Sequence, residues 1–221
     1  MSESSSIKTI LILSANPAGT VPLRLDQEVR QIKDGLKRSK HRDRFRLEQA
    51  EAVNAIDLQR AMLDFNPQIV HFCGHGEEEG IILENGAGEA AFVDAEALAD
   101  TFSFFETQVE CVLLNACYSA VQAEAIVHHI DSVIGMSQAV GDRAAIDFAV
   151  SFYDALGAGR PIDFAHRWGC NALKLKQRRK SDGSSAANIP VLHRKASPVE
   201  VGKSAVYVPT TVKPARIFIS Y

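Results

Sequence analysis

A histidine and a cysteine, His75 and Cys117, each stand directly after a short apolar segment and have small residues beside them. His75 lies between two glycines in the sequence CGHG at 73–76, and Cys117 lies in the sequence NACYS at 115–119. An imidazole can take the proton of a thiol, and the resulting thiolate is a strong nucleophile. The two residue types therefore suit nucleophilic catalysis, provided that the fold brings them together.

The segments before these residues indicate how they are positioned. Residues 67–72 and 109–114 contain continuous apolar runs, which are typical of strands covered on both faces. Parallel strands end at the same edge of a sheet, where open α/β folds bind ligands. We expect His75 to be the base and Cys117 the nucleophile. The backbone N–H groups of Gly76 and Cys117 would form the oxyanion hole, and the helix predicted from about residue 120 would favour a negatively charged sulfur.

Strands and helices alternate over most of the chain. Apolar segments and helical spacing predict strands at 9–13, 46–53, 132–136 and 189–192, and helices from Pro22, after Asn54 and Asp94, over 145–156 and from Pro161. Alternation with short connections predicts an α/β fold with a mainly parallel sheet and helices on both faces. Asn85-Gly86 separates two apolar runs, 81–83 and 90–93, and predicts a small hairpin after His75. The basic, serine-rich residues 176–188 predict a mobile loop.

The two ends of the chain differ in composition from the middle. Residues 1–7 are polar and predict a disordered N-terminus, whereas residues 8–193 hold the whole strand and helix pattern and predict one domain. Residues 194–213 read as an extended linker. Residues 214–221 begin a new apolar strand, so we expect them to be the start of a further, truncated domain.

Composition excludes several classes of function. The chain is 46% hydrophobic and has a net charge of -3, which gives no reason to expect binding to nucleic acid or to a membrane. The polar N-terminus lacks a signal-peptide pattern, so a cytoplasmic location is expected. None of the four cysteines forms a CxxC pair, so we expect neither disulfides nor a metal site, and no cofactor. Cys73, Cys111, Cys170 and His71 are expected to be core residues.

The sequences HFCGHG and LLNACYS, together with SANP at 14–17, resemble the CHAT domain of the caspase-like cysteine peptidases. The resemblance covers roughly residues 8–193 and implies a caspase-haemoglobinase-like sheet, with His75 and Cys117 as the catalytic dyad. It also implies a place for Asn16 in substrate binding. Residues 216–221, RIFISY, resemble the first strand of a TIR domain, which implies a TIR-like domain as a partner in the same full-length chain.

Asp142 has two possible roles. Caspase-like enzymes that cut after Arg or Lys usually carry a carboxylate at the base of the primary pocket, and Asp142 follows the strand 132–136 in the right chain order. Asp142 also stands at the start of a predicted helix and would be able to cap it. The sequence leaves both roles open.

Three functions follow from these observations. The first is a cysteine endopeptidase acting on a protein or peptide substrate, an effector or signalling protease in a prokaryotic stress or defence system. The second is a catalytically silent peptide-binding module coupled to a TIR domain; the presence of both His75 and Cys117 favours the first. The third is a nucleotide-binding module, but no GxGxxG or GxxxxGK[ST] sequence follows the first strand. The sequence leaves open whether the chain forms an oligomer.

Overall fold

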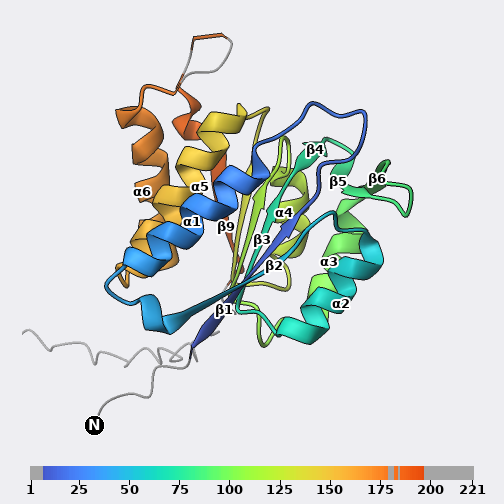
Figure 1. Ribbon diagram of the computed structural model, residues 1–221, viewed down its shortest axis with the longest axis horizontal. Coiled ribbons are helices and arrows are strands. Elements are labelled where there is room, and N and C mark those ends of the chain that lie inside the picture. The colour runs from blue at the N-terminus through green and yellow to red at the C-terminus, as the bar shows by residue number, and fades with distance from the viewer. Residues whose placement is uncertain (1–6, 179–181, 184, 197–221) are drawn as a thin grey trace, which may run out of the picture.

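A six-stranded sheet forms the centre of the molecule (Figure 1). The computed structural model describes residues 7–178, 182–183 and 185–196. The strand order in the main sheet is β2-β1-β3-β7-β8-β9, in which only β9 runs antiparallel to its neighbour. These strands are β1 (Lys8–Ser14), β2 (Phe45–Ala50), β3 (Ile69–Cys73), β7 (Cys111–Asn115), β8 (Ser132–Met136) and β9 (Pro190–Arg194).

Helices cover both faces of this sheet (Figure 1). One face carries α1 (Leu25–Arg38), α5 (Asp142–Gly157) and α6 (Ile162–Leu175). The other face carries α2 (Ala55–Phe65), α3 (Ala95–Ser103) and α4 (Ala120–Ile126). Short 3-10 helices occur at Arg42–Arg44 and Ala186–Asn188. The predicted α/β architecture with a mainly parallel sheet is therefore confirmed.

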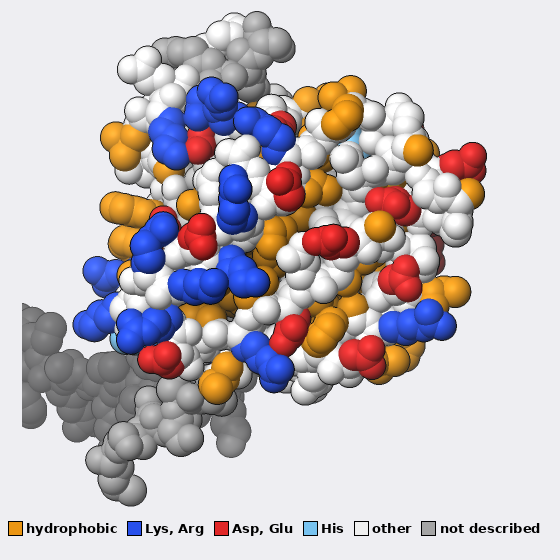
Figure 2. Space-filling view, viewed as in Figure 1, with side chains coloured by type: hydrophobic (Ala, Val, Ile, Leu, Met, Phe, Trp, Pro, Cys, Tyr) orange, Lys and Arg blue, Asp and Glu red, His pale blue; other side chains and the backbone are white. Residues whose placement is uncertain are grey.

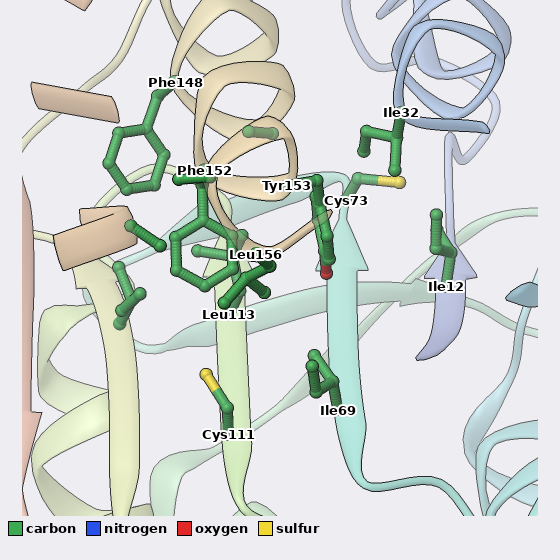
Figure 3. Close-up of a cluster of buried hydrophobic side chains, with 14 of the residues drawn as sticks. Ile12, Ile32, Ile69, Cys73, Cys111, Leu113, Phe148, Phe152, Tyr153 and Leu156 are labelled. Atoms are coloured by element: carbon green, nitrogen blue, oxygen red, sulfur yellow. The ribbon is translucent and has the colours of Figure 1, made fainter. Parts of the chain in front are cut away.

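Strand β1 shows why the sheet needs both helix layers. Ile10 and Ile12 face the cluster under α1, α5 and α6, whereas Leu11 and Leu13 face the cluster under α2, α3 and α4. All four side chains are buried, as alternation on a doubly covered strand requires. Figure 3 shows the first cluster, in which aromatic side chains of α5 pack on the strands.

The predicted hairpin is present and belongs to a separate antiparallel sheet. Its strands are β4 (His75–Glu77), β5 (Gly80–Glu84) and β6 (Ala90–Val93), in the order β4-β5-β6. The turn between β5 and β6 is closed by Asn85, whose Oδ1 accepts hydrogen bonds from the N–H groups of Ala87 and Glu89. His75 is the first residue of β4, so the small sheet begins at the candidate base.

Some predicted elements need correction. The first helix begins at Leu25 rather than at Pro22, and the second strand ends at Ala50 rather than Val53. The predicted mobile loop 176–188 is partly ordered, because Lys176 and Arg178 both pair with the buried carboxylate of Asp147 at 2.6 and 2.5 Å. The predicted edge strand is confirmed as β9.

The predicted disordered N-terminus, most of the linker and the TIR-like strand fall on residues 1–6 and 197–221, which lie outside the described residues. Within the described part, no helix is both long enough and apolar enough to cross a membrane.

Charged side chains are distributed unevenly on the face shown in Figure 2: Lys and Arg lie mainly over the layer containing α1, and Asp and Glu lie mainly over the opposite half. The small net charge of -3 does not reveal that the two signs are separated on this face.

Candidate active site

His75 is held by the loop that follows β1. Its Nε2 lies 3.2 Å from Oδ1 of Asn16, and the same oxygen accepts a hydrogen bond from the N–H of Leu23 at 3.4 Å. The Asn16 N–H in turn donates to a carboxylate oxygen of Glu84. Because an amide oxygen only accepts, the contact with His75 requires a proton on Nε2. Asn16 therefore orients the imidazole and favours the tautomer that carries a proton on Nε2.

Partial burial changes the acidity of this imidazole. Desolvation lowers the pKa of His75 below its ordinary value of 6.5, and a hydrogen bond with the Val21 backbone opposes the change in part. Desolvation disfavours the charged form of a histidine, so the neutral ring is favoured near neutral pH. A neutral imidazole is the form that accepts a proton.

Cys117 stands on a sharp turn between β7 and α4. The next residue, Tyr118, has φ of 56°, which is a left-handed conformation that few non-glycine residues adopt. The Ser119 hydroxyl holds the turn: it donates toward the carbonyls of Leu114 and Ala116 at 2.8 Å and accepts the Met136 N–H at 2.9 Å. The buried Ser119 side chain thus ties the cysteine-bearing turn to strands β7 and β8.

The sulfur of Cys117 contacts the backbone of Val140, in the segment between β8 and α5. The Val140 N–H lies 3.4 Å from Sγ, and the Val140 carbonyl oxygen lies 3.7 Å from it. A thiol can donate to the carbonyl and a thiolate can accept from the N–H, so one residue serves both forms of the sulfur. The sequence predicted stabilisation of the sulfur by helix α4, whereas the donor to the sulfur that the structure places there is Val140. No sequence pattern marks this residue.

His75 and Cys117 line one small pocket at the carboxyl edge of the main sheet. The predicted meeting of the two strand ends is thus observed. The volume of this pocket is about 40 Å³, which leaves room for little more than water. Its other lining residues come from the β1–α1 loop, α1, the strand ends and the start of α5; they are Leu23, Leu25, Glu28, Gly74, Asn115, Ala116, Val140, Asp142 and Ala145.

Gly76 lies against the turn that carries Cys117. A Cβ atom built on Gly76 would be 2.5 Å from the carbonyl oxygen of Cys117 and 3.1 Å from the Ala116 Cβ. Contacts below 3.0 Å are essentially never observed, so only glycine fits here without moving the turn. The two backbones therefore lie close together, with the Cys117 carbonyl directed at Gly76. The oxyanion hole formed by the N–H groups of Gly76 and Cys117 stays a prediction.

Asp142 lines the pocket as its sequence position suggested, but it does not cap α5. The N-cap of α5 is Gly141, and no side chain caps the helix; Asp142 is the first helical residue. Its carboxylate instead accepts from Arg24, through the backbone N–H at 3.3 Å and through Nε at 2.6 Å. The capping interpretation is therefore wrong, because the side chain points toward the start of α1 and not back to its own helix.

Burial raises the thiol pKa of the other three cysteines. Burial raises the pKa of the Cys111 thiol to about 12, and burial followed by the nearby Glu28 carboxylate raises that of Cys73. Cys170 also has a histidine neighbour, since its Sγ lies 3.7 Å from Nε2 of His166, but burial raises its pKa to about 11. All three thiols are therefore protonated at neutral pH. Among the described residues, no three His, Cys, Asp or Glu side chains gather as a metal site would require.

Comparison with known proteins agrees with this geometry. The model of the CHAT domain family matches residues 13–179, which include Asn16, His75, Cys117 and Asp142. The chain belongs to the CHAT family. A "Roc-COR-CHAT protease" from an unknown prokaryotic organism is 29% identical over 188 residues, which are 80% of this chain and 17% of that protein. The chain thus spans about a sixth of the length of this relative.

Solved structures show the same fold in cysteine proteases. A secreted C11 cysteine protease from Bacteroides thetaiotaomicron superposes with a TM-score of 0.59 at 12% identity, over 86% of this chain and 66% of its own. Caspase-1 from Spodoptera frugiperda gives a TM-score of 0.56 at 9% identity, over 86% and 87% of the two chains. The CHAT domain described here therefore has the caspase-like fold, and the sequence relatives that it matches are named as proteases. No comparison supports a TIR domain in residues 214–221.

Proposed function

We propose that this CHAT domain is a cysteine endopeptidase with His75 as general base and Cys117 as nucleophile. The observation that carries the proposal is the common pocket of His75 and Cys117, in which a second residue, Val140, presents both a donor and an acceptor to the sulfur. Asn16 keeps the Nε2 proton in place, so that Nδ1 is the basic nitrogen of the neutral ring.

The reaction divides into two steps. His75 takes the thiol proton, the thiolate attacks the carbonyl carbon of the scissile peptide bond, and the oxygen becomes an oxyanion facing the N–H groups of Cys117 and Gly76. Collapse of this intermediate breaks the C–N bond, and His75 gives its proton to the leaving amine. Water then attacks the thioester with His75 again as base, which releases the acid product and restores the thiol.

The test is cleavage of an unfolded protein substrate by the wild type and by Cys117→Ala. Loss of one member of a coupled pair costs about 10³-fold or more in rate, so Cys117→Ala and His75→Ala should both be inactive. Cys170→Ala is the matched control, because it removes the other partly exposed thiol beside a histidine. Iodoacetamide should modify Cys117 before the remaining cysteines. Undiminished cleavage by Cys117→Ala would refute the proposal.

We also propose that Asp142 sets a preference for Arg or Lys on the acyl side of the cleaved bond. Arg24 pairs with the Asp142 carboxylate in this structure, and an ion pair as exposed as this one is worth only about 0–1 kcal/mol. A substrate guanidinium can therefore replace Arg24 and form the same charge-assisted bonds. Asp142 would then recognise the substrate side chain directly.

Two variants separate this specificity from simple ion pairing. Asp142→Asn and Arg24→Ala both remove the Arg24–Asp142 ion pair, but only the first removes the carboxylate. In a peptide library, Asp142→Asn should lose the preference for basic residues, whereas Arg24→Ala should keep it and cut basic substrates at least as fast. Equal profiles of the two variants, or a wild-type preference for small apolar residues, would exclude this role.

More broadly, we propose that the protein is an effector or signalling protease in a prokaryotic stress or defence system, and that its full-length chain contains a TIR-like partner domain. Its support is the RIFISY sequence at 216–221 and the name of a relative that couples a CHAT protease to Roc-COR. Sequencing the gene beyond the codon for Tyr221 tests the TIR part. A downstream sequence that lacks the remaining strands and helices of such a domain would remove it.

A further inference from the structure

A buried carboxylate lines the pocket of the candidate dyad. Glu28 is in the first part of α1, is only 3% exposed, and lines the same pocket as His75 and Cys117. Glutamate is almost never fully buried unless it is paired. The contacts of Glu28 therefore need an explanation.

Its shortest contact leads to the segment that carries the nucleophile. The Asn115 Nδ2 donates to Oε1 of Glu28 at 2.6 Å, and both side chains are buried. Asn115 is the last residue of β7 and stands two residues before Cys117. The turn that carries Cys117 therefore begins directly after Asn115. A hydrogen bond with an ionised acceptor is about twice as strong as one between neutral groups. Glu28 thus fixes the start of the Cys117 turn.

A second contact reaches the same oxygen of the carboxylate. His71 Nε2 is 3.2 Å from Oε1, but the geometry is too poor for a hydrogen bond, and neither ring nitrogen has another hydrogen-bond partner. The His71 ring instead stacks on Tyr153 of α5, with ring centroids 5.6 Å apart and planes 13° apart. Figure 3 shows Tyr153 extending from α5 toward β3. His71 thus lies against the oxygen that accepts from Asn115, and its ring is held by the stack on Tyr153 and not by a hydrogen bond.

Stability alone does not account for this arrangement. Desolvating an ion costs several kcal/mol, and replacing a buried ionic group with an apolar one is often neutral or stabilising. The Oδ1 of Asn115 also remains buried without a partner, which adds a further cost. Both unfavourable contributions to stability arise from Glu28 and Asn115, the two residues that join α1 to the turn carrying Cys117.

We infer that Glu28 is a positioning residue, which holds the Asn115 side chain and thereby the backbone and thiol of Cys117 in the geometry that attack requires. The inference rests on the proposed peptidase function. A misplacement of about 1 Å at a reacting group can cost about 10²-fold in rate. Loss of the Glu28 charge should therefore lower kcat far more than it changes KM.

Glu28→Gln tests the inference, because it keeps the volume and removes the charge. We expect kcat to fall by about 10- to 100-fold with KM unchanged within twofold, and the rate at which iodoacetamide modifies Cys117 to fall as well. Asp147→Asn is the matched control: it neutralises another buried carboxylate with two charged partners, on α5 but outside the pocket. The Asp147→Asn protein should have a lower melting temperature than the wild type, whereas its kcat should stay within twofold of the wild-type value.

A double-mutant cycle shows whether Glu28 acts through Asn115. If it does, Asn115→Ala alone and Asn115→Ala with Glu28→Gln should be slowed equally, because the first change already breaks the link. Independent, multiplying losses would overturn the inference, and so would a folded Glu28→Gln protein with wild-type kcat and alkylation rate. Iodoacetamide modification needs no peptidase activity, so failure of the proposed function, seen as a wild type that cleaves nothing, is recognised separately.

Discussion

His75 gives the clearest residue-scale prediction, because burial lowers its pKa. In a Cys117→Ala protein, NMR titration of the His75 ring should give a midpoint below 6.5. Between the folded value and 6.5 the unfolded chain binds more protons than the folded chain, so stability must fall as the pH is lowered through this range. His75→Gln lacks this contribution and should lose less stability between pH 7.5 and pH 5.5. A midpoint above 6.5 would contradict the prediction.

Gly76 should be intolerant of any side chain. Gly76→Ala places a methyl group 2.5 Å from the Cys117 carbonyl oxygen, which forces the nucleophile turn to move. We expect peptidase activity to fall by about 10²-fold or more. Gly86→Ala, in the β5–β6 turn of the same small sheet, meets nothing within 4 Å and serves as the control. Comparable losses in both variants would show that the small sheet, and not the contact with Cys117, is responsible.

At this scale the sequence identified the residues that carry distinctive local patterns. His75 and Cys117 could be found because small residues flank each one directly after an apolar run. Val140, Arg24 and Glu28 could not, since their importance depends on contacts between segments far apart in the chain: 23 residues separate Val140 from Cys117 and 87 separate Glu28 from Asn115. None of the three stands in a pattern that marks a site.

At the scale of elements, Asn54 should contribute to stability without contributing to activity. Its side chain accepts the N–H groups of Ile56 and Asp57, and the Asp57 carboxylate accepts the Asn54 N–H in return. Loss of such a cap costs about 1 kcal/mol. Asn54→Ala should therefore lower the free energy of unfolding by about that amount and leave kcat unchanged. Gln59→Ala, at an exposed position in the middle of α2, should change neither quantity.

Element types were more predictable than element ends. Strand β3 has a continuous apolar run and α1 has apolar residues at helical spacing, so both were recognisable. The start of α1 was misplaced because Pro22 suits a helix start in general, whereas here the backbone of Arg24 is engaged by Asp142 from another element. The ordering of Lys176 and Arg178 was missed for the same reason: their partner, Asp147, lies on α5.

For the whole molecule, both core clusters and all strands of the two sheets lie between Lys8 and Arg194. A chain that lacks residues 197–221 should therefore unfold in one cooperative transition at nearly the same temperature as the longer chain. Differential scanning calorimetry of the two chains makes the comparison. A loss of more than about 4 °C, which corresponds to roughly 1 kcal/mol or more for a domain of this size, would assign the tail to this core.

The antiparallel strand β9 has a consequence for a chain that has been cut. The chain leaves α6 at Leu175 and returns to the sheet at Pro190, where five residue pairs join β9 to β8, His166 contacts the Pro190 carbonyl at 3.0 Å, and Arg194 binds Asp163. Every residue of the candidate pocket precedes this connection. Cleavage between α6 and β9 would thus yield two polypeptides on a denaturing gel but a single particle in gel filtration, with its pocket intact. Nicking and inactivation would be separate events in this protein.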